Sequence, residues 1–192
     1  SIIVIAFLAF VAITIFKGVR IVPQGYKWIV QRLGKYHTTL NPGLNFVIPY
    51  VDEVAYKVTT KDIVLDIPSQ EVITRDNAVL LMNAVAYINL TTPEKAVYGI
   101  ENYSWAIQNL VQTSLRSIVG EMDLDDALSS RDHIKARLKS SISDDISDWG
   151  ITLKTVEIQD IKPSITMQTA MEEQAAAERQ RRATVTKADG EK

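Results

Sequence analysis

The sequence contains no cysteine and only two histidines, His37 and His133. Disulfides, thiol nucleophiles and cysteine-bound metals are therefore excluded, and neither histidine has the spacing of a metal site. The chain also lacks a glycine-rich phosphate loop and a serine elbow. The segment Asp123–Asp126 begins like a calcium loop, but Leu128 stands where such a loop needs glycine. The sequence therefore predicts no catalytic residues, no metal and no cofactor.

Acidic and basic residues are nearly balanced, because the formal net charge is −2. This balance gives no basic footprint for nucleic acid, which we therefore do not expect as a partner. The distribution is uneven, however, with five bases and no acid between residues 17 and 40. Bases beside an apolar run attract anionic lipid and favour the cytoplasmic side of a membrane. The predicted headgroup contacts are Lys17, Arg20, Lys27, Arg32 and Lys35.

The chain does have one long hydrophobic run, since no charge occurs before Lys17. A helix over this run is apolar all round, which favours a membrane anchor over a buried helix with one polar face. Its first sixteen residues rise only about 24 Å against a hydrocarbon core of about 30 Å, but apolar residues continue to Val22. A secretion signal is disfavoured because no basic leader or cleavage site is visible. We predict a transmembrane helix within residues 1–22, with anchor residues Ile2, Ile3, Phe7, Leu8, Phe10, Ile13, Ile15 and Phe16.

A second uncharged stretch runs from Tyr36 to Val51. Pro42 and Pro49 exclude a long helix in this stretch. By pattern alone, its apolar residues fit either a buried strand or a second contact with the membrane. The candidates for that second contact are Leu44, Phe46, Val47 and Ile48.

The rest of the chain predicts strands followed by helices. Residues 26–91 are rich in alternating β-branched residues, with a hairpin turn expected at Arg75–Asn77. A short helix opens at Pro93, and two longer ones end at Gly120 and Gly150. Their apolar stripes are Ile107, Leu110, Val111, Leu115 and Ile118 in one, and Ile134, Leu138, Ile142 and Ile146 in the other. Residues 151–161 return to strand, so we expect an α+β fold with a mixed or antiparallel sheet and packed helices.

After Pro163 the chain has many Ala, Gln and charged residues but few large apolar ones. One helix of this composition has too little apolar surface for a core, which favours packing against copies of itself over the alternative of a solvated tail. The predicted oligomerisation residues are Met171, Ala175, Ala176, Glu178, Arg179, Arg181 and Arg182. The expected domains are an anchor over 1–22, a folded domain over 23–162, and the start of a long oligomerisation helix over 163–192.

Six segments, in order along the chain, resemble the stomatin branch of the stomatin–prohibitin–flotillin (SPFH, band 7) superfamily. They are IVPQGY, GKYHTTLNPGLNFVIPYVD, LDIPSQEVITRDN, LRSIVGEMDLDDALSSRD, WGITLKTVEIQDIKP and AAAERQRRATVTKADGEK. Within this branch, the chain resembles bacterial stomatin-like proteins of the paraslipin and QmcA type. The last segment matches the start of the family's long coiled-coil helix, whereas later repeats and a C-terminal apolar segment have no counterpart here.

This resemblance implies a non-enzymatic membrane scaffold that assembles into a large homo-oligomeric ring or cage and organises membrane microdomains. The implied partners are copies of itself, anionic membrane lipids, and a membrane protease or small membrane protein. The alternative function is a regulatory subunit that encloses a membrane ATP-dependent protease. In relatives the first half of the domain dips into the membrane surface, which favours the membrane reading of residues 44–48. The implied location is the bacterial inner membrane, with a single pass and the domain on the cytoplasmic side.

Overall fold

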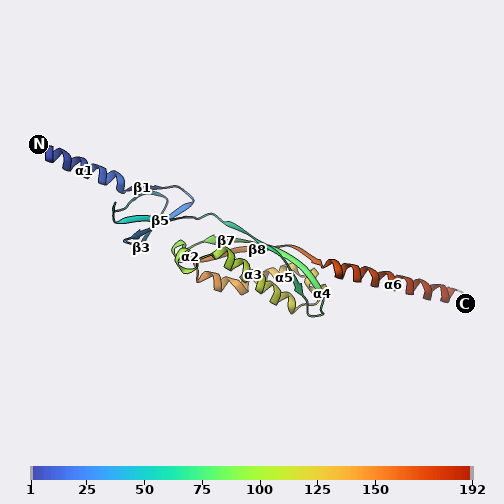
Figure 1. The fold of residues 1–192 in the computed structure, drawn as a ribbon. Helices are drawn as coiled ribbons and strands as arrows, with labels where there is room; N and C mark the ends of the chain where they lie inside the picture. Colours follow the sequence, from blue (N-terminus) through green and yellow to red (C-terminus); the bar gives the residue numbers. More distant parts are fainter. Residues whose placement is uncertain (1, 191–192) are drawn as a thin grey trace. The chain divides into compact units, whose positions relative to one another are not determined.

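The computed structural model describes residues 2–190, with side chains described from 2 to 186. Strands dominate the first half of the chain and helices the second, as predicted (Figure 1). The order of elements is α1 (Ile2–Gly18), β1 (Val19–Val22), β2 (Tyr26–Arg32), β3 (Lys35–Leu40), β4 (Gly43–Phe46), β5 (Asp52–Thr59), β6 (Ile63–Ile73), β7 (Val79–Leu90), α2 (Pro93–Gly99), α3 (Tyr103–Gly120), α4 (Leu124–Ser129), α5 (Arg131–Ser147), β8 (Ile151–Pro163) and α6 (Ile165–Gly190). The fold is therefore α+β.

The chain divides into two compact units. The first comprises the residues up to 65 together with 87–107 and 143–155, and the second comprises 66–86, 108–142 and the residues from 156 onward. The division falls within β6, β7, β8, α3 and α5, so these elements contribute residues to both units. The predicted domain boundaries at residues 22 and 162 stay a prediction.

The first unit holds a three-stranded sheet of order β3-β2-β5 and a separate ribbon in which β1 pairs with β4. Both strand pairings of the sheet and that of the ribbon are antiparallel. The ribbon attaches to the sheet through Val22, which is buried in one cluster with Val30 and Leu40. The half-buried side chains packed against this cluster are Trp28, Val47 and Val54.

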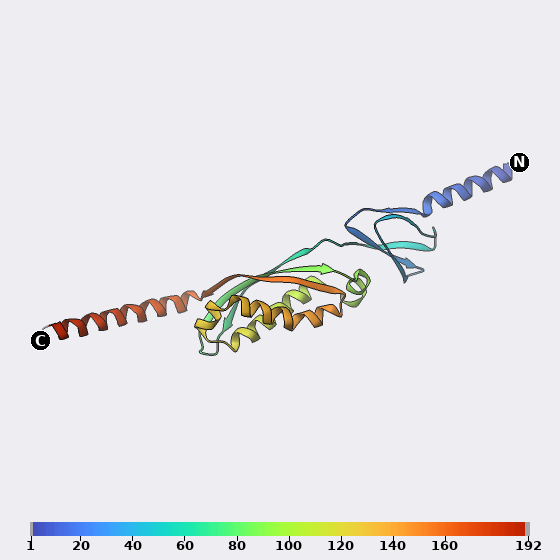
Figure 2. The same cartoon turned by 180° about the vertical axis from the view of Figure 1, so that it is seen from behind.

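The second unit contains most of a sheet of order β6-β7-β8, with α3 and α5 on one of its faces (Figure 2). The predicted hairpin between β6 and β7 is present, closed by the Thr74 N–H donating to the Ala78 carbonyl at 2.9 Å. Strand β8 runs antiparallel to β7, because Ser164 bonds to Val79 and Asp160 bonds to Asn83. The predicted helix stripes are confirmed, since buried residues in this unit include Val111, Leu115, Ile118, Ile134, Leu138 and Ile142.

The short helix α4 is capped at its N-terminus by a carboxylate from the β6–β7 turn. The Asp76 carboxylate, in the β6–β7 turn, accepts hydrogen bonds from the Thr74 hydroxyl and from the Leu124 N–H. These two bonds lower the pKa of Asp76, the hydroxyl having the larger effect. Asp123–Asp126 therefore lie at a helix N-terminus that is capped by Asp76 rather than by the Asp123 side chain.

The prediction of a transmembrane helix is wrong. Helix α1 has 17 residues, rises about 26 Å, and gives way at Val19 to strand β1. Between residues 2 and 190, no helix combines the length and the apolar character needed to cross a membrane. The predicted single-pass localisation fails for the same reason. The apolar residues of α1 are nevertheless exposed along the whole helix.

The buried-strand reading of residues 36–51 does not hold either. Leu40, at the end of β3, is buried, but Leu44, Phe46 and Ile48 are exposed. Val47 is half-buried because its side chain packs against the cluster of Val22, Val30 and Leu40. Residues 43–46 thus form one strand of the ribbon, and residues 47–51 form the loop that follows it.

Candidate membrane-contact surface

The β1–β4 ribbon packs one face on the sheet through Val22 and exposes large apolar side chains on the other. Its register places Val19 opposite Phe46 and Ile21 opposite Leu44, so these four side chains share a face. Val22, on the other face, is 2% exposed, whereas Ile21 is 70% and Phe46 71% exposed. A two-stranded ribbon with large apolar side chains turned outward leaves a surface that water solvates poorly.

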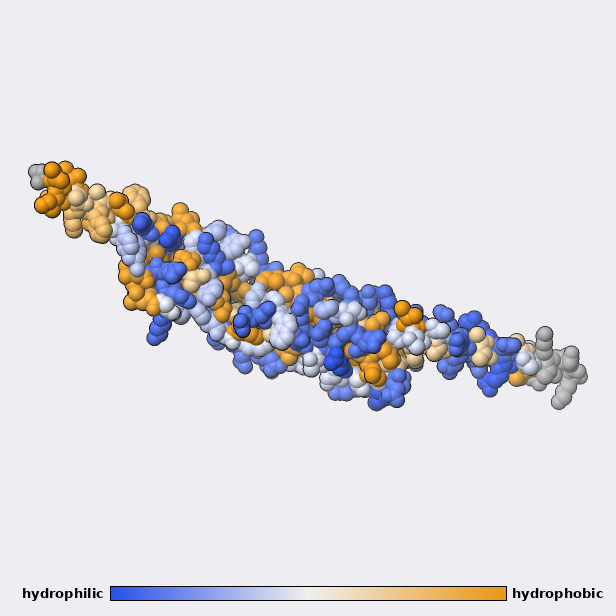
Figure 3. Space-filling view, viewed as in Figure 1, coloured by the Kyte–Doolittle hydropathy of each residue, from blue (hydrophilic) through white to orange (hydrophobic). Residues whose placement is uncertain are grey.

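Helix α1 continues directly from this ribbon. The Val47 N–H donates to the Gly18 carbonyl at 2.8 Å, which fixes the end of the helix beside the ribbon. The two backbones approach so closely that a Cβ at Gly18 would lie 2.7 Å from the Val47 carbonyl oxygen. Hydrophobic atoms cover α1 in the space-filling view (Figure 3). We call α1 and the exposed face of the ribbon the apolar surface.

A hollow of about 560 Å³ borders the apolar surface where α1 ends. Two cations, Lys17 and Arg20, lie among its lining residues. The Lys17 ammonium stands 5.5 Å from the centre of the Tyr50 ring, within the range of a cation–π contact. The remaining lining residues are Phe16, Val47, Pro49, Tyr50 and Asp52. Cations beside an apolar border suit a phosphate-bearing lipid headgroup.

The carboxylate at this hollow is already neutralised by an ion pair. The Arg32 guanidinium donates to both oxygens of Asp52, at 2.6 and 3.0 Å, and the Ile48 N–H donates at 2.8 Å. The Asp52 side chain is only 3% exposed. Arg32, helped by the Ile48 N–H, lowers the pKa of Asp52 to about 2. Arg32 is thus engaged within the protein, while Lys17 and Arg20 give the hollow its net positive charge.

Two residues near this hollow were missed by sequence reasoning. Leu33 and Tyr50 have positive φ angles of 50° and 71°, which is uncommon for residues other than glycine. Leu33 is 84% exposed at the tip of the β2–β3 hairpin, and its N–H donates to the Val51 carbonyl at 3.2 Å. Strained positions that expose large apolar side chains point to a contact surface. The sequence signal was Leu-Gly in a two-residue hairpin turn, where Asn-Gly is favoured.

The predicted oligomerisation residues lie together on α6 in the second unit. The helix begins after Ser164, whose hydroxyl caps it by accepting the Met167 N–H at 3.2 Å. Glu178 accepts bonds from Arg181 and Arg182, each at 3.1 Å, and these two arginines lower the pKa of Glu178. The other predicted members, namely Met171, Ala175, Ala176 and Arg179, are exposed. Their role in assembly stays a prediction.

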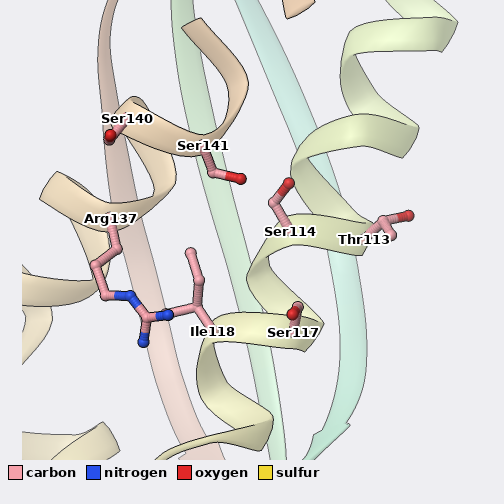
Figure 4. A pocket seen from close by; sticks show the side chains of 7 residues that line it. All are labelled: Thr113, Ser114, Ser117, Ile118, Arg137, Ser140 and Ser141. Atoms are coloured by element: carbon pink, nitrogen blue, oxygen red, sulfur yellow. The ribbon is translucent and has the colours of Figure 1, made fainter. Parts of the chain in front are cut away.

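A further hollow lies between α3 and α5, in the second unit (Figure 4). Its volume is about 460 Å³, and hydroxyl groups from both helices line it. Arg137 at its edge pairs with Glu121 at 2.7 Å. The lining offers no base beside a serine, as a nucleophile would require. Over the described part of the chain, no three potential ligands come together as a metal site.

Comparisons with known proteins define the class. The profile of the SPFH domain / Band 7 family matches residues 20–192, and the chain belongs to this family. It is 41% identical over 178 residues to an uncharacterised protein of Methanocaldococcus jannaschii, covering 93% of this chain and 89% of that protein. It is 37% identical over 169 residues to the human mitochondrial stomatin-like protein 2, covering 88% of this chain and 48% of that protein.

An uncharacterised protein of Mycobacterium tuberculosis is 36% identical over 181 residues, covering 94% of this chain and 48% of that protein. The chain thus spans about half the length of the human and mycobacterial relatives. The predicted resemblance to the SPFH family is confirmed. Proteins of this family are generally non-enzymatic, associate with membranes and oligomerise, and the family assignment therefore favours a membrane-associated scaffold.

Proposed function

We propose that this protein is a membrane-associated scaffold that contacts lipid through the first unit. The observation that carries the proposal is the apolar surface of α1 and the β1–β4 ribbon, bordered by the hollow that holds Lys17 and Arg20. Lipid is the occupant that satisfies both parts of this arrangement. Its acyl region accepts the apolar side chains, and an anionic headgroup accepts the two cations. The contact is made from one side of a bilayer and needs no spanning segment.

The energies of such a contact are individually modest. Burial of apolar area contributes roughly 25 cal/mol per Å², and each cation near an anionic surface contributes about 1 kcal/mol. Many copies held together multiply these contributions without any new contact. We therefore propose that the protein acts as a homo-oligomeric ring or cage, with α6 among its assembly contacts, organising lipid and partner proteins in microdomains.

A regulatory subunit of a membrane ATP-dependent protease is the alternative from the sequence. Purification in mild detergent separates the two functions. A homogeneous homo-oligomer favours the scaffold, whereas a stoichiometric ATPase-protease in the same particle favours the regulator.

Flotation with lipid vesicles tests the lipid contact. The double variant Ile21→Asp/Phe46→Asp places two charges on the exposed ribbon face, where the wild-type side chains are mostly exposed. We expect it to keep its fold by circular dichroism but to lose most binding to vesicles that contain anionic lipid. The wild type should bind these vesicles more strongly than vesicles of phosphatidylcholine alone.

The matched control is Ile165→Asp, which charges an exposed apolar side chain at the start of α6 in the second unit. This variant should float as the wild type does. Full flotation by the ribbon variant would overturn the proposed surface. Unfolding of the ribbon variant would mean that its side chains belong to a core rather than to a lipid contact.

A further inference from the structure

Strand β5 is an edge strand beside a hollow. The sheet order β3-β2-β5 leaves β5 with β2 on one side and, among residues 2–190, no strand on the other. On that free side lies a hollow of about 340 Å³ between β5 and the segment that runs from α2 to the start of α3. Its apolar lining comes from Tyr56, Val58, Leu90, Ala96, Val97, Ile100 and Tyr103. An open backbone edge therefore coincides with an apolar recess.

The pairing register identifies which backbone groups face outward. The Thr60 N–H donates to the Gly25 carbonyl at 2.9 Å, and Lys27 stands opposite Val58 in the same register. Because hydrogen-bonded pairs alternate along an antiparallel ladder, Val58 directs its N–H and C=O toward β2. Lys57 and Thr59 must then direct theirs away from β2, toward the hollow. The backbone N–H and C=O groups of Lys57 and Thr59 thus form the hydrogen-bonding pattern that an added strand requires.

Edge strands are usually protected against pairing with another chain, and this protection is weak in residues 56–59 of β5. A lysine at an edge commonly blocks further pairing by its charge, but the Lys57 ammonium lies 4.5 Å from the centre of the Trp28 ring. Its charge is thus held over the sheet by a cation–π contact rather than presented at the edge. The register shift at Ile29/Val30 interrupts the ladder before Tyr56, so the regular free edge is the short stretch 56–59.

Charge complementarity indicates what the added strand carries. Lys57 and Glu101 are the only charged residues among those lining the hollow. Lys57 is turned onto Trp28, and Glu101 is exposed at the rim. A basic side chain is therefore favoured beside the apolar one that fills the recess.

We propose that the edge of β5 binds an extended segment of a partner polypeptide by strand addition. The segment pairs with Lys57 and Thr59, places an apolar side chain in the recess next to α2, and carries a basic residue that meets Glu101. This site is separate from the lipid contact and does not depend on it.

Selection from a library of random nine-residue peptides tests the proposal, with the full chain held in mild detergent. Enriched peptides should alternate apolar residues and contain Arg or Lys. Binding should slow hydrogen exchange at the Lys57 and Thr59 amides. If no enriched peptide protects these amides, the proposal is overturned.

Two substitutions at one position give the sharper comparison. Lys57→Pro and Lys57→Ala both remove the contact with Trp28, but only proline removes the outward N–H. We expect Lys57→Pro to weaken peptide affinity about tenfold or more and Lys57→Ala to weaken it by less than about threefold. Equal affinities would show that the hollow takes a side chain without strand pairing, which overturns the proposal.

Two further readouts cover the remaining outcomes. If Lys57→Pro does not fold by circular dichroism, Glu101→Lys replaces it, and we expect that variant to reject the basic peptides and bind them at least about tenfold more weakly. If Lys57→Pro changes the sedimentation of the chain without peptide, the edge pairs with a second copy, and the proposed partner is wrong.

Discussion

At the scale of single residues, Asp52 holds together the backbone around the cationic hollow. Its carboxylate joins Arg32 at the end of β2 to the Ile48 N–H in the loop before β5. The ion pair also neutralises the one acid that lines the hollow, so that Lys17 and Arg20 determine its sign. The same carboxylate therefore serves both the fold of this loop and the proposed attraction of anionic lipid.

Asp52→Asn should destabilise the protein by about 1–2 kcal/mol at pH 7, because a charge-assisted bond is weakened while Arg32 keeps part of its hydration. The pKa of Asp52 is lowered to about 2, against about 3.9 in an unfolded chain. The stabilisation is thus complete above about pH 4 and is lost as the pH falls through 2. Urea unfolding at several pH values should show wild type and variant converging toward pH 2.

Asp123→Asn is the matched control for this measurement. Its pair with Arg75 has side chains 41% and 64% exposed, so the loss should stay below about 1 kcal/mol. If Asp52→Asn costs no more than this control at pH 7, the Arg32–Asp52 pair does not stabilise the hollow.

At the scale of elements, sequence periodicity predicted the helices better than the ribbon. The stripes of α3 and α5 are local patterns, and both helices end near the glycines expected to stop them. The β1–β4 pairing joins Val19 to Phe46, which no local pattern reveals. The run of apolar residues through Val22 was therefore predicted as one helix. In the structure the helix ends at Gly18, where the Gly18 carbonyl accepts the Val47 N–H and the chain continues as strand.

For the candidate membrane-contact surface, too, the sequence predicted the residue types better than their arrangement in space. The apolar character of Leu44, Phe46 and Ile48 was visible in the sequence, and their exposure was not, because it depends on which face of the ribbon Val22 buries. The pairing of Arg32 with Asp52 likewise needed the approach of β2 to the start of β5. The free edge of β5 required the complete strand order.

The junction between α5 and β8 gives an element-scale prediction. Gly150 has φ of +70°, and a Cβ there would lie 2.5 Å from the Thr92 carbonyl oxygen. Gly150→Ala should therefore lower the free energy of unfolding by about 2 kcal/mol or more, through strain and overpacking combined. Urea unfolding followed by circular dichroism measures this loss.

Gly99→Ala is the control, because Gly99 ends α2 with open space around it and no positive φ. Its effect should lie within about 0.5 kcal/mol of zero. Equal effects of the two alanines would show that the α5–β8 junction tolerates a side chain and that the close approach to Thr92 is not required.

At the scale of the whole molecule, the proposed lipid contact belongs to the first unit and α6 to the second. A closed ring of three or more subunits around one axis requires every subunit to present two unlike contact faces. From Ile165 to Thr186, the side chains of α6 are exposed or half-buried, and its small alanines permit close approach of another backbone. Under the proposed function, membrane binding by many weak contacts depends on this assembly, because each copy contributes only a modest binding energy.

The variant Ala176→Glu/Arg181→Glu tests α6 as an assembly element. Glutamate at Ala176 obstructs a close helix seam, and glutamate at Arg181 removes one partner of Glu178. Exposed ion pairs contribute about 0–1 kcal/mol, so the charge change alone should only raise salt sensitivity. The steric and desolvation cost repeats at every interface, and we expect sedimentation in mild detergent to show a much smaller particle. Ala136→Glu/Arg131→Glu makes the same two changes at exposed positions of α5 and should keep the parent's size. If the α6 variant also keeps that size at moderate and high salt, contacts outside this helix must hold the subunits together.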